Sequence, residues 1–140
     1  MADDLRPNLG TLHPIMITPN MDKLVERGLL MSRTYVQQQV CSPSRNSYMT
    51  GRRPDRTRVW NFLDDFRVAR NDSTGEGGVN GNGASWATLP GYFLKMGYNV
   101  FGSGKTYHPN RPLNNDGSRS WLAYDQEIPG DRNHSCNNGK

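Results

Sequence analysis

The chain has 140 residues, a formal net charge of +4 and a hydrophobic fraction of 34%, with 15 Gly and 9 Pro. An ordinary domain is ~45–50% apolar when Gly is counted, so this composition predicts a loop-rich slice of a larger α/β protein. Positive charge permits a polyanionic partner, but without a helix-turn-helix, zinc-finger or aromatic-repeat pattern we predict no nucleic-acid binding. No stretch approaches the ~20 apolar residues of a membrane span, and residues 1–10 lack the apolar core of a signal peptide.

Residues 18–36 predict a helix followed by a strand. Thr18 is a capping residue type, Pro19 suits the first helical turn, and Gly28 stands where the helix would end. Residues 29–36 are apolar enough to form a strand. Open α/β sheets place their sites where a strand gives way to a loop and then a helix, at the carboxyl end of the strand.

The next stretch places a thiol at a predicted helix start. Pro43 suits the first turn, and Ser42 and Ser44 are capping residue types. Gly51 suits a left-handed stop. We therefore predict a short helix with Cys41 at its amino end, where the helix favours an anionic ligand. A lone Cys is, however, more often a small buried hydrophobe or half of a disulfide than a nucleophile.

Arginines and a second acidic pair follow the thiol. The arginines within a few turns of it are Arg45, Arg52, Arg53, Arg56 and Arg58. Guanidinium groups suit bidentate recognition of sulfate or carboxylate. The alternative is a solvated basic loop, because Arg-Pro-Asp at residues 53–55 is turn chemistry in any protein. Asp64 and Asp65 have nothing nearby to complete a metal site, so we expect both to be exposed.

The second half predicts a glycine-rich loop, a helix and a short strand. Residues 71–83 hold too many glycines for a regular element and no phosphate-binding motif. A helix is predicted over residues 89–96. Its apolar residues repeat at helical spacing and predict a core face: Leu89, Tyr92, Phe93 and Met96. A short strand then ends in Gly104 and Lys105, and His108 follows three residues later.

The last part of the chain predicts no element. Residues 109–140 are polar and rich in turn residues, and their large apolar anchors are Trp121 and Tyr124. Two sequons, at Asn71 and Asn133, would be glycosylation acceptors in a secretory protein.

Two motifs together resemble the signatures of the type I sulfatases. The first is Cys-Ser-Pro-Ser-Arg at residues 41–45, followed by Thr-Gly-Arg at residues 50–52. The second is the strand that ends at residues 104–105 with His108 after it. Departures from the usual residues of the family are Gln39, Tyr48 and Val100. The resemblance covers nearly the whole chain, and the iduronate sulfatases are the most similar branch.

The resemblance implies an alkaline-phosphatase-like α/β fold, of which residues 1–140 would be a partial amino-terminal catalytic domain. In the family a formylglycine-generating enzyme oxidises the signature cysteine to formylglycine, which implies this modification for Cys41. The hydrated aldehyde attacks sulfur with one hydroxyl and expels sulfate with help from the other. The other catalytic residues that the resemblance implies are Arg45, Lys105 and His108, the last two in contact with the sulfate.

The resemblance also implies a calcium ion. An Asp-Asp pair at the end of the first sulfatase strand binds a divalent cation through carboxylate oxygens, and the pair of Asp3 and Asp4, followed by Leu-Arg-Pro, matches it. The implied metal ligands are Asp3, Asp4 and Cys41. The apolar strand expected before this pair and the later Asp-His or Asp-Asn pair of the family do not occur in the chain, which is expected to be a fragment or to have its true start upstream.

Several substrates are compatible with the resemblance. A sulfated glycosaminoglycan comes first, and choline sulfate or an aryl sulfate are alternatives. The implied location is lysosomal or secreted. A phosphate or phosphonate monoester hydrolase is the alternative within the superfamily, and a truncated, inactive fragment that at most binds polyanions is the rival from another class.

The second of the 2 Cys, Cys136, is predicted to have no partner in the chain. Oxidation of Cys41 to an aldehyde would remove the other thiol, and an unpaired Cys in a secretory protein usually pairs elsewhere. The resemblance places the partner of Cys136 downstream of Lys140.

Overall fold

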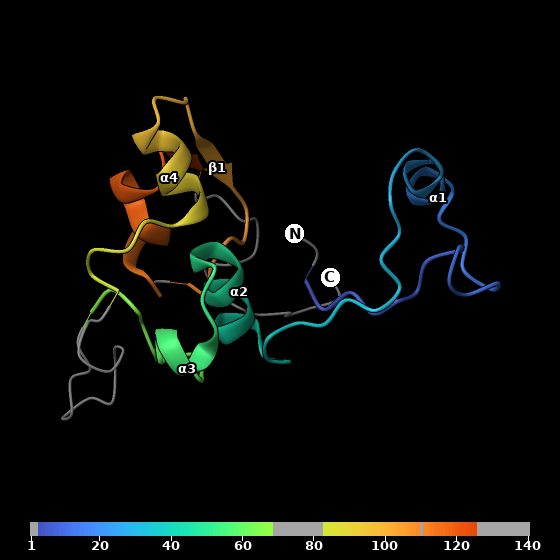
Figure 1. The fold of residues 1–140 in the computed structure, drawn as a ribbon, viewed down its shortest axis with the longest axis horizontal. Helices are drawn as coiled ribbons and strands as arrows, with labels where there is room; N and C mark the ends of the chain where they lie inside the picture. The colour runs from blue at the N-terminus through green and yellow to red at the C-terminus, as the bar shows by residue number, and fades with distance from the viewer. Residues whose placement is uncertain (1–2, 69–82, 110, 126–140) are drawn as a thin grey trace, which may run out of the picture. The chain divides into compact units, whose positions relative to one another are not determined.

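The structure, a computed structural model, describes residues 3–68, 83–109 and 111–125 (Figure 1). The chain divides into two compact units, Met1–Val36 and Gln37–Lys140. Among the described residues, no helix has both the length and the apolar character needed to cross a bilayer.

The first unit contains the helix α1 (Pro19–Arg27), which confirms the helix predicted there. Thr18 occupies the cap position and Gly28 follows the last turn, as expected. The Thr18 hydroxyl does not cap the helix. It accepts the N–H of Gly10 (2.7 Å) and donates to Asp22 Oδ1 (3.0 Å), so it ties the preceding loop to the first turn.

The strand predicted over residues 29–36 is absent, and this prediction is wrong. Leu29 is 84% exposed and Tyr35 is 82% exposed. A strand is stable only when a neighbouring strand takes up its backbone N–H and C=O groups. The one sheet among the described residues pairs other segments, so this apolar stretch forms irregular loop with a turn at Ser32 and Arg33.

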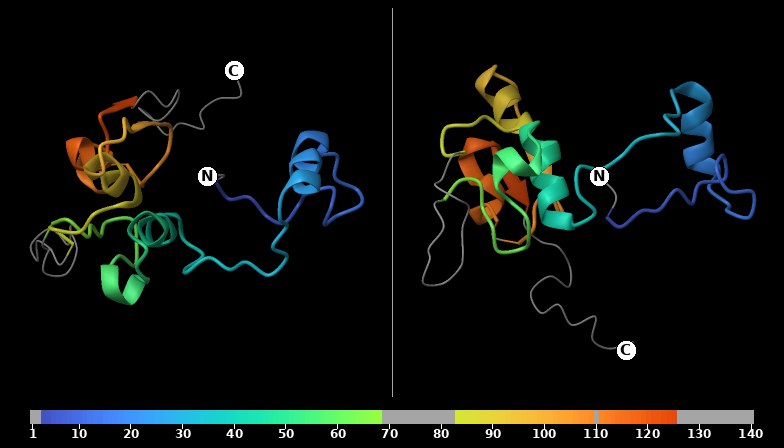
Figure 2. Two further views of the ribbon diagram at one scale, coloured as in Figure 1. Left: turned by 45° about the horizontal axis from the view of Figure 1, so that its top comes forward. Right: turned by 60° about the horizontal axis from the view of Figure 1, so that its bottom comes forward.

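The second unit combines helices with a small parallel sheet, which is consistent with part of an α/β domain. Its elements are α2 (Cys41–Thr50), α3 (Pro54–Thr57), α4 (Leu89–Lys95), β1 (Phe101–Ser103), η2 (Leu113–Arg119) and β2 (Ala123–Asp125). The strand β1 pairs with β2 in parallel, with Gly102 opposite Tyr124. Figure 2 shows η2 next to β2, and α2 contacts both α3 and α4.

The core of this unit is small, as the low apolar fraction predicts. Its buried residues are Met49, Val59, Phe66, Tyr107 and Trp121. Trp86, Val100 and Tyr124 pack against them and are half-buried. Trp121 and Tyr124 were predicted as anchors, and both are confirmed in this cluster, with ring centroids 5.2 Å apart.

The helix predicted over residues 89–96 is confirmed as α4, but its predicted core face is wrong. Thr88 caps the helix by accepting the N–H of Gly91 (3.1 Å). The four apolar residues of the predicted face are exposed: Leu89, Tyr92, Phe93 and Met96. Pro90 and Gly91 are buried instead. A Cβ on Gly91 would lie 2.6 Å from the Arg119 carbonyl oxygen, so α4 packs closely through its first turn.

Residues 111–125 are more ordered than their sequence predicts, since η2 and β2 form where no element was expected. A buried ion pair holds them. Arg67 Nε and Nη2 donate to Asp116 Oδ1 and Oδ2, each at 2.7 Å. Arg67 Nη1 donates to the carbonyls of Gly83 (2.7 Å) and Trp86 (2.5 Å), and Ser120 donates from its hydroxyl to Asp116. One guanidinium therefore joins three segments that are distant in the sequence.

The expectation that Asp64 and Asp65 are exposed is wrong, because both are buried. Asp64 Oδ2 accepts the N–H of Trp60 (2.8 Å), and Asp65 Oδ1 accepts the N–H of Arg67 (2.7 Å). The two carboxylates act as side-chain caps for a segment without regular structure. Burial raises the pKa of Asp65, against the lowering effect of the Arg67 N–H and of nearby guanidinium groups.

Candidate active site

The helix α2 places Cys41 in its first turn, as predicted. Gly51 ends it with φ of 65°, which confirms the left-handed stop. The predicted serine cap is wrong: Val40 occupies the cap position in extended conformation, and no side chain caps the helix. Ser42 is buried and Ser44 is half-buried within the helix. No capping side chain therefore accepts a hydrogen bond from the N–H groups of the first turn.

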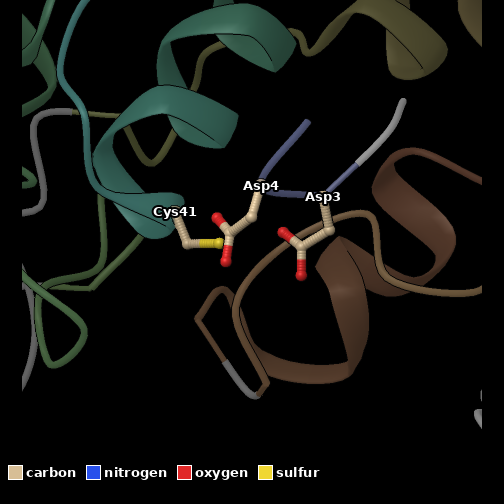
Figure 3. A group of neighbouring side chains, drawn as sticks. All are labelled: Asp3, Asp4 and Cys41. Carbon is tan, nitrogen blue, oxygen red and sulfur yellow. The ribbon is translucent and has the colours of Figure 1, made fainter. Parts of the chain in front are cut away.

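Figure 3 shows the side chains of the three residues implied as metal ligands. Cys41 lies at the start of α2 and is half-buried. Asp3 and Asp4 are consecutive, exposed residues of the first unit, and Asp4 has a positive φ of 50°. Asp residues tolerate this left-handed conformation better than most other residues.

The second signature lies directly beside Cys41. Lys105 Nζ donates to Cys41 Sγ over 3.5 Å, although the two residues are 64 positions apart. The strand predicted before Lys105 is confirmed as β1. Gly104 follows it with φ of 71°, a conformation that favours glycine, and turns the chain toward α2. The structure thus brings the two predicted motifs together at the amino end of a helix.

Arg45 lies one helical turn after Cys41 and is only 3% exposed. Its Nη1 donates to the carbonyl oxygen of Lys105 and, at 3.4 Å, to that of Thr106. The guanidinium therefore binds the backbone of the turn that carries Lys105. Buried arginine is well suited to this, because its donors lie in a fixed plane.

A residue outside the predicted site also contacts this turn. The hydroxyl of Tyr124 donates to the Gly104 carbonyl (2.5 Å) and lies 2.7 Å from Thr106 Oγ1. The sequence identified Tyr124 only as an apolar anchor. Its second role depends on the pairing of β1 with β2, which the irregular sequence around β2 did not predict.

His108 is half-buried and its ring lies against Phe62, with ring centroids 4.6 Å apart. Its carbonyl accepts the N–H of Arg111 (2.9 Å) within an isolated antiparallel bridge. Tyr107, directly before it, is 1% exposed and packs against Phe66. Burial and the Asp116 carboxylate raise the pKa of Tyr107, so the buried phenol stays protonated and anchors the segment.

The arginines after α2 have different environments. Arg52 lies over the ring of Trp86, 4.3 Å from its centroid, and donates to the Thr50 carbonyl (2.7 Å). Arg53 pairs with the exposed Asp55 (2.8 Å). The two remaining arginines are exposed: Arg56 and Arg58. The structure therefore does not support recognition of one anion by all five arginines, because Arg45 and Arg52 already donate to backbone carbonyls of the chain.

Several predictions concern residues outside the described part of the chain. These are residues 71–82 of the glycine-rich loop, both sequons and Cys136. The absence of a disulfide between Cys41 and Cys136 stays a prediction.

Comparison with known proteins gives a consistent result. Residues 1–132 match the family model described as Sulfatase. Iduronate 2-sulfatase of Homo sapiens is 37% identical over 124 residues, which cover 86% of this chain and 20% of that protein. N-acetylgalactosamine-6-sulfatase of Homo sapiens is 36% identical over 99 residues, which cover 71% of this chain and 18% of that protein. Arylsulfatase A of Bos taurus is 46% identical over 57 residues, 39% of this chain and 11% of that protein.

The chain spans about a fifth of the length of the two human relatives. The family match, in contrast, extends over nearly all of its residues and includes both signature motifs. The chain belongs to the sulfatase family and resembles iduronate 2-sulfatase over most of its length.

Proposed function

We propose that this chain is the part of a sulfate ester hydrolase that carries the nucleophile, within an alkaline-phosphatase-like fold. The observation that carries the proposal is the 3.5 Å contact between Lys105 Nζ and Cys41 Sγ at the amino end of α2. A fixed ammonium and the N–H groups of a first helical turn both favour an anionic group at this position.

The nucleophile would be formylglycine made from Cys41. This group supplies a hydrated aldehyde whose oxygen can attack sulfur, which an unmodified side chain does not offer. Lys105 would stabilise the negative charge on the oxygens of the transferring group. His108 would act as proton donor to the reacting oxygen, and Arg45 would hold the turn on which Lys105 lies.

The chemistry of the donors supports a calcium ion held by Asp3 and Asp4. Carboxylate oxygens are hard ligands, which calcium prefers. The soft sulfur of Cys41 does not fit this cation, whereas the oxygen of formylglycine at the same position would. Calcium takes about six to eight oxygens, more than these residues offer.

Sulfated sugars are the proposed substrates. The names of two relatives specify sulfate esters of iduronate and of N-acetylgalactosamine, and both are sugars. The exposed Arg56 and Arg58 add positive charge that would attract a polyanionic chain such as a glycosaminoglycan. Such a substrate agrees with the proposed lysosomal or secreted location.

The test is expression of the complete protein beside a formylglycine-generating enzyme, followed by assays with matched aryl sulfate and aryl phosphate esters. We expect hydrolysis of the sulfate ester and none by the Cys41→Ala variant. Faster hydrolysis of the phosphate ester would favour a phosphate monoester hydrolase. Formylglycine proven by mass spectrometry without any turnover would favour the inactive fragment.

A further inference from the structure

We propose that Tyr124 is a positioning residue whose hydroxyl holds the turn of residues 104–106 so that the Lys105 ammonium reaches Cys41. Its effect on catalysis rests on the proposed function. The claim that Tyr124 holds the turn rests on the contacts of its side chain alone.

The phenol oxygen of Tyr124 connects the two ends of the turn. It lies 2.5 Å from the Gly104 carbonyl oxygen and 2.7 Å from Thr106 Oγ1. A phenol has one proton, so it can donate to only one of these groups. A carbonyl can only accept, so Tyr124 donates to Gly104 while the Thr106 hydroxyl can donate to Tyr124. The residue between these ends is Lys105.

Arg45 binds the same turn from helix α2. Tyr124 of β2 holds the carbonyl of Gly104, and Arg45 of α2 holds those of Lys105 and Thr106. Three consecutive carbonyls of the turn are thus bound by two side chains. Lysine has a long flexible stem, so a fixed backbone at Lys105 limits the positions that its ammonium can reach.

The absence of a side chain at Gly102 leaves space for the Tyr124 ring. Gly102 is the register partner of Tyr124, and a Cβ at Gly102 would lie 2.5 Å from Tyr124 Cδ2 and 2.8 Å from Trp121 Cε3. Real Cβ atoms do not approach ring carbons so closely, because non-bonded carbon atoms prefer a separation of about 3.5–4.0 Å and repel one another at shorter distances. Any side chain at position 102 would therefore displace the ring, and the hydroxyl with it.

The first test follows the motion of the turn and needs no catalysis. Tyr124→Phe removes the hydroxyl and keeps the ring, while Gly102→Ala displaces the ring and keeps the hydroxyl. In both variants the NMR order parameters of the Lys105 and Thr106 amides should fall from about 0.85, typical of rigid backbone, toward about 0.6. The control is Tyr98→Phe, at an exposed tyrosine of the same unit. Unchanged order parameters in Tyr124→Phe would overturn the proposal.

The second test asks whether Tyr124 acts through Lys105. In active enzyme, loss of one hydrogen bond should lower kcat about fivefold in Tyr124→Phe. The same substitution in a Lys105→Ala background should have no further effect, because residues that act through each other are not additive. Independent effects of the two substitutions would contradict the proposal. Absence of sulfatase activity in the unsubstituted protein would instead remove the proposed function, and the order parameters would still decide whether Tyr124 holds the turn.

Discussion

Arg67 binds both carboxylate oxygens of Asp116 in the interior of the second unit, where their side chains are 8% and 1% exposed. The pair is bidentate, which gives charge-assisted hydrogen bonds their best geometry. The remaining donors of Arg67 bind backbone carbonyls. The Arg67 guanidinium thus stabilises a unit whose apolar core is small.

Arg67→Ala should lower the free energy of unfolding by ~3–5 kcal/mol, because removal of one partner leaves the buried Asp116 charge uncompensated. Urea unfolding followed by fluorescence measures this change. The control is Arg53→Ala, which breaks the exposed pair with Asp55 (74% and 56% exposed) and should cost about 1 kcal/mol or less. Equal losses in the two variants would contradict the structural role of the buried pair.

Asp65→Asn should stabilise the protein at neutral pH. Burial raises the pKa of Asp65 above its usual 3.8, so the folded state binds the proton more tightly than the unfolded state. The stability that this proton provides is complete below the unfolded pKa and is lost as pH rises through the folded pKa. The Asn side chain keeps the acceptor for the Arg67 N–H and carries no charge.

The measurement for Asp65→Asn is urea unfolding at pH 7 and near pH 3. The variant should exceed the unsubstituted protein in stability at pH 7, and the difference should shrink as the solution is acidified. Asp55→Asn, at an exposed position, serves as the control. A difference that stays constant with pH would show that the charge of Asp65 is not the cause.

Cys41 should become formylglycine when the chain is made beside the modifying enzyme, because residues 41–45 present the modification core of the family. Mass spectrometry of the peptide that contains residue 41 should show sulfur replaced by a carbonyl oxygen. In the complete enzyme, Cys41→Ala should abolish turnover and leave the folded structure nearly unchanged by circular dichroism. A peptide that keeps its thiol in a competent host would count against the prediction.

In the complete enzyme, Lys105→Ala and His108→Ala should each lower kcat by ~10²–10³, the usual cost of one donor that acts on developing charge. Substrate affinity should change far less than kcat. Lys95→Ala is the matched control, since Lys95 is an exposed lysine in the last turn of α4. Turnover that survives both substitutions would show that the second signature serves only the fold.

Asp3→Asn and Asp4→Asn should each weaken calcium binding, because each replaces a charged hard ligand by a neutral one. Isothermal titration calorimetry of the complete protein with calcium measures this effect without substrate. Asp22→Asn is the control in the same unit, since Asp22 binds Thr18. Affinity that is equal in all variants would remove the two residues from the proposed metal site.

The sequence predicted the elements whose signals are local. Pro and Gly mark the ends of α1, α2 and α4, and all three helices form within a residue or two of the predicted bounds. The meeting of Lys105 with Cys41 came from family resemblance, since no periodicity relates residues 64 positions apart.

The predictions that failed concern contacts between residues that lie far apart in the sequence. Residues 29–36 have strand composition but no described strand pairs with them. Asp65 was expected to be exposed, but its carboxylate is buried and accepts the N–H of Arg67. The guanidinium of Arg67 binds Asp116, 49 positions away, and no local pattern relates these two residues. Tyr124 gained its contact with Gly104 only through a parallel pairing that the sequence around β2 does not encode locally.

The exposed face of α4 has a consequence for experiments in solution. Phe93 lies edge-on to both Tyr92 and Tyr98, so aromatic rings gather on this face. Kosmotropic anions strengthen the association of apolar surfaces, and sulfate is among the strongest. Sulfate added at the high concentrations used for salting-out would therefore promote self-association of the chain through this face. Light scattering recorded across a titration with sulfate separates this salting-out from inhibition by bound sulfate.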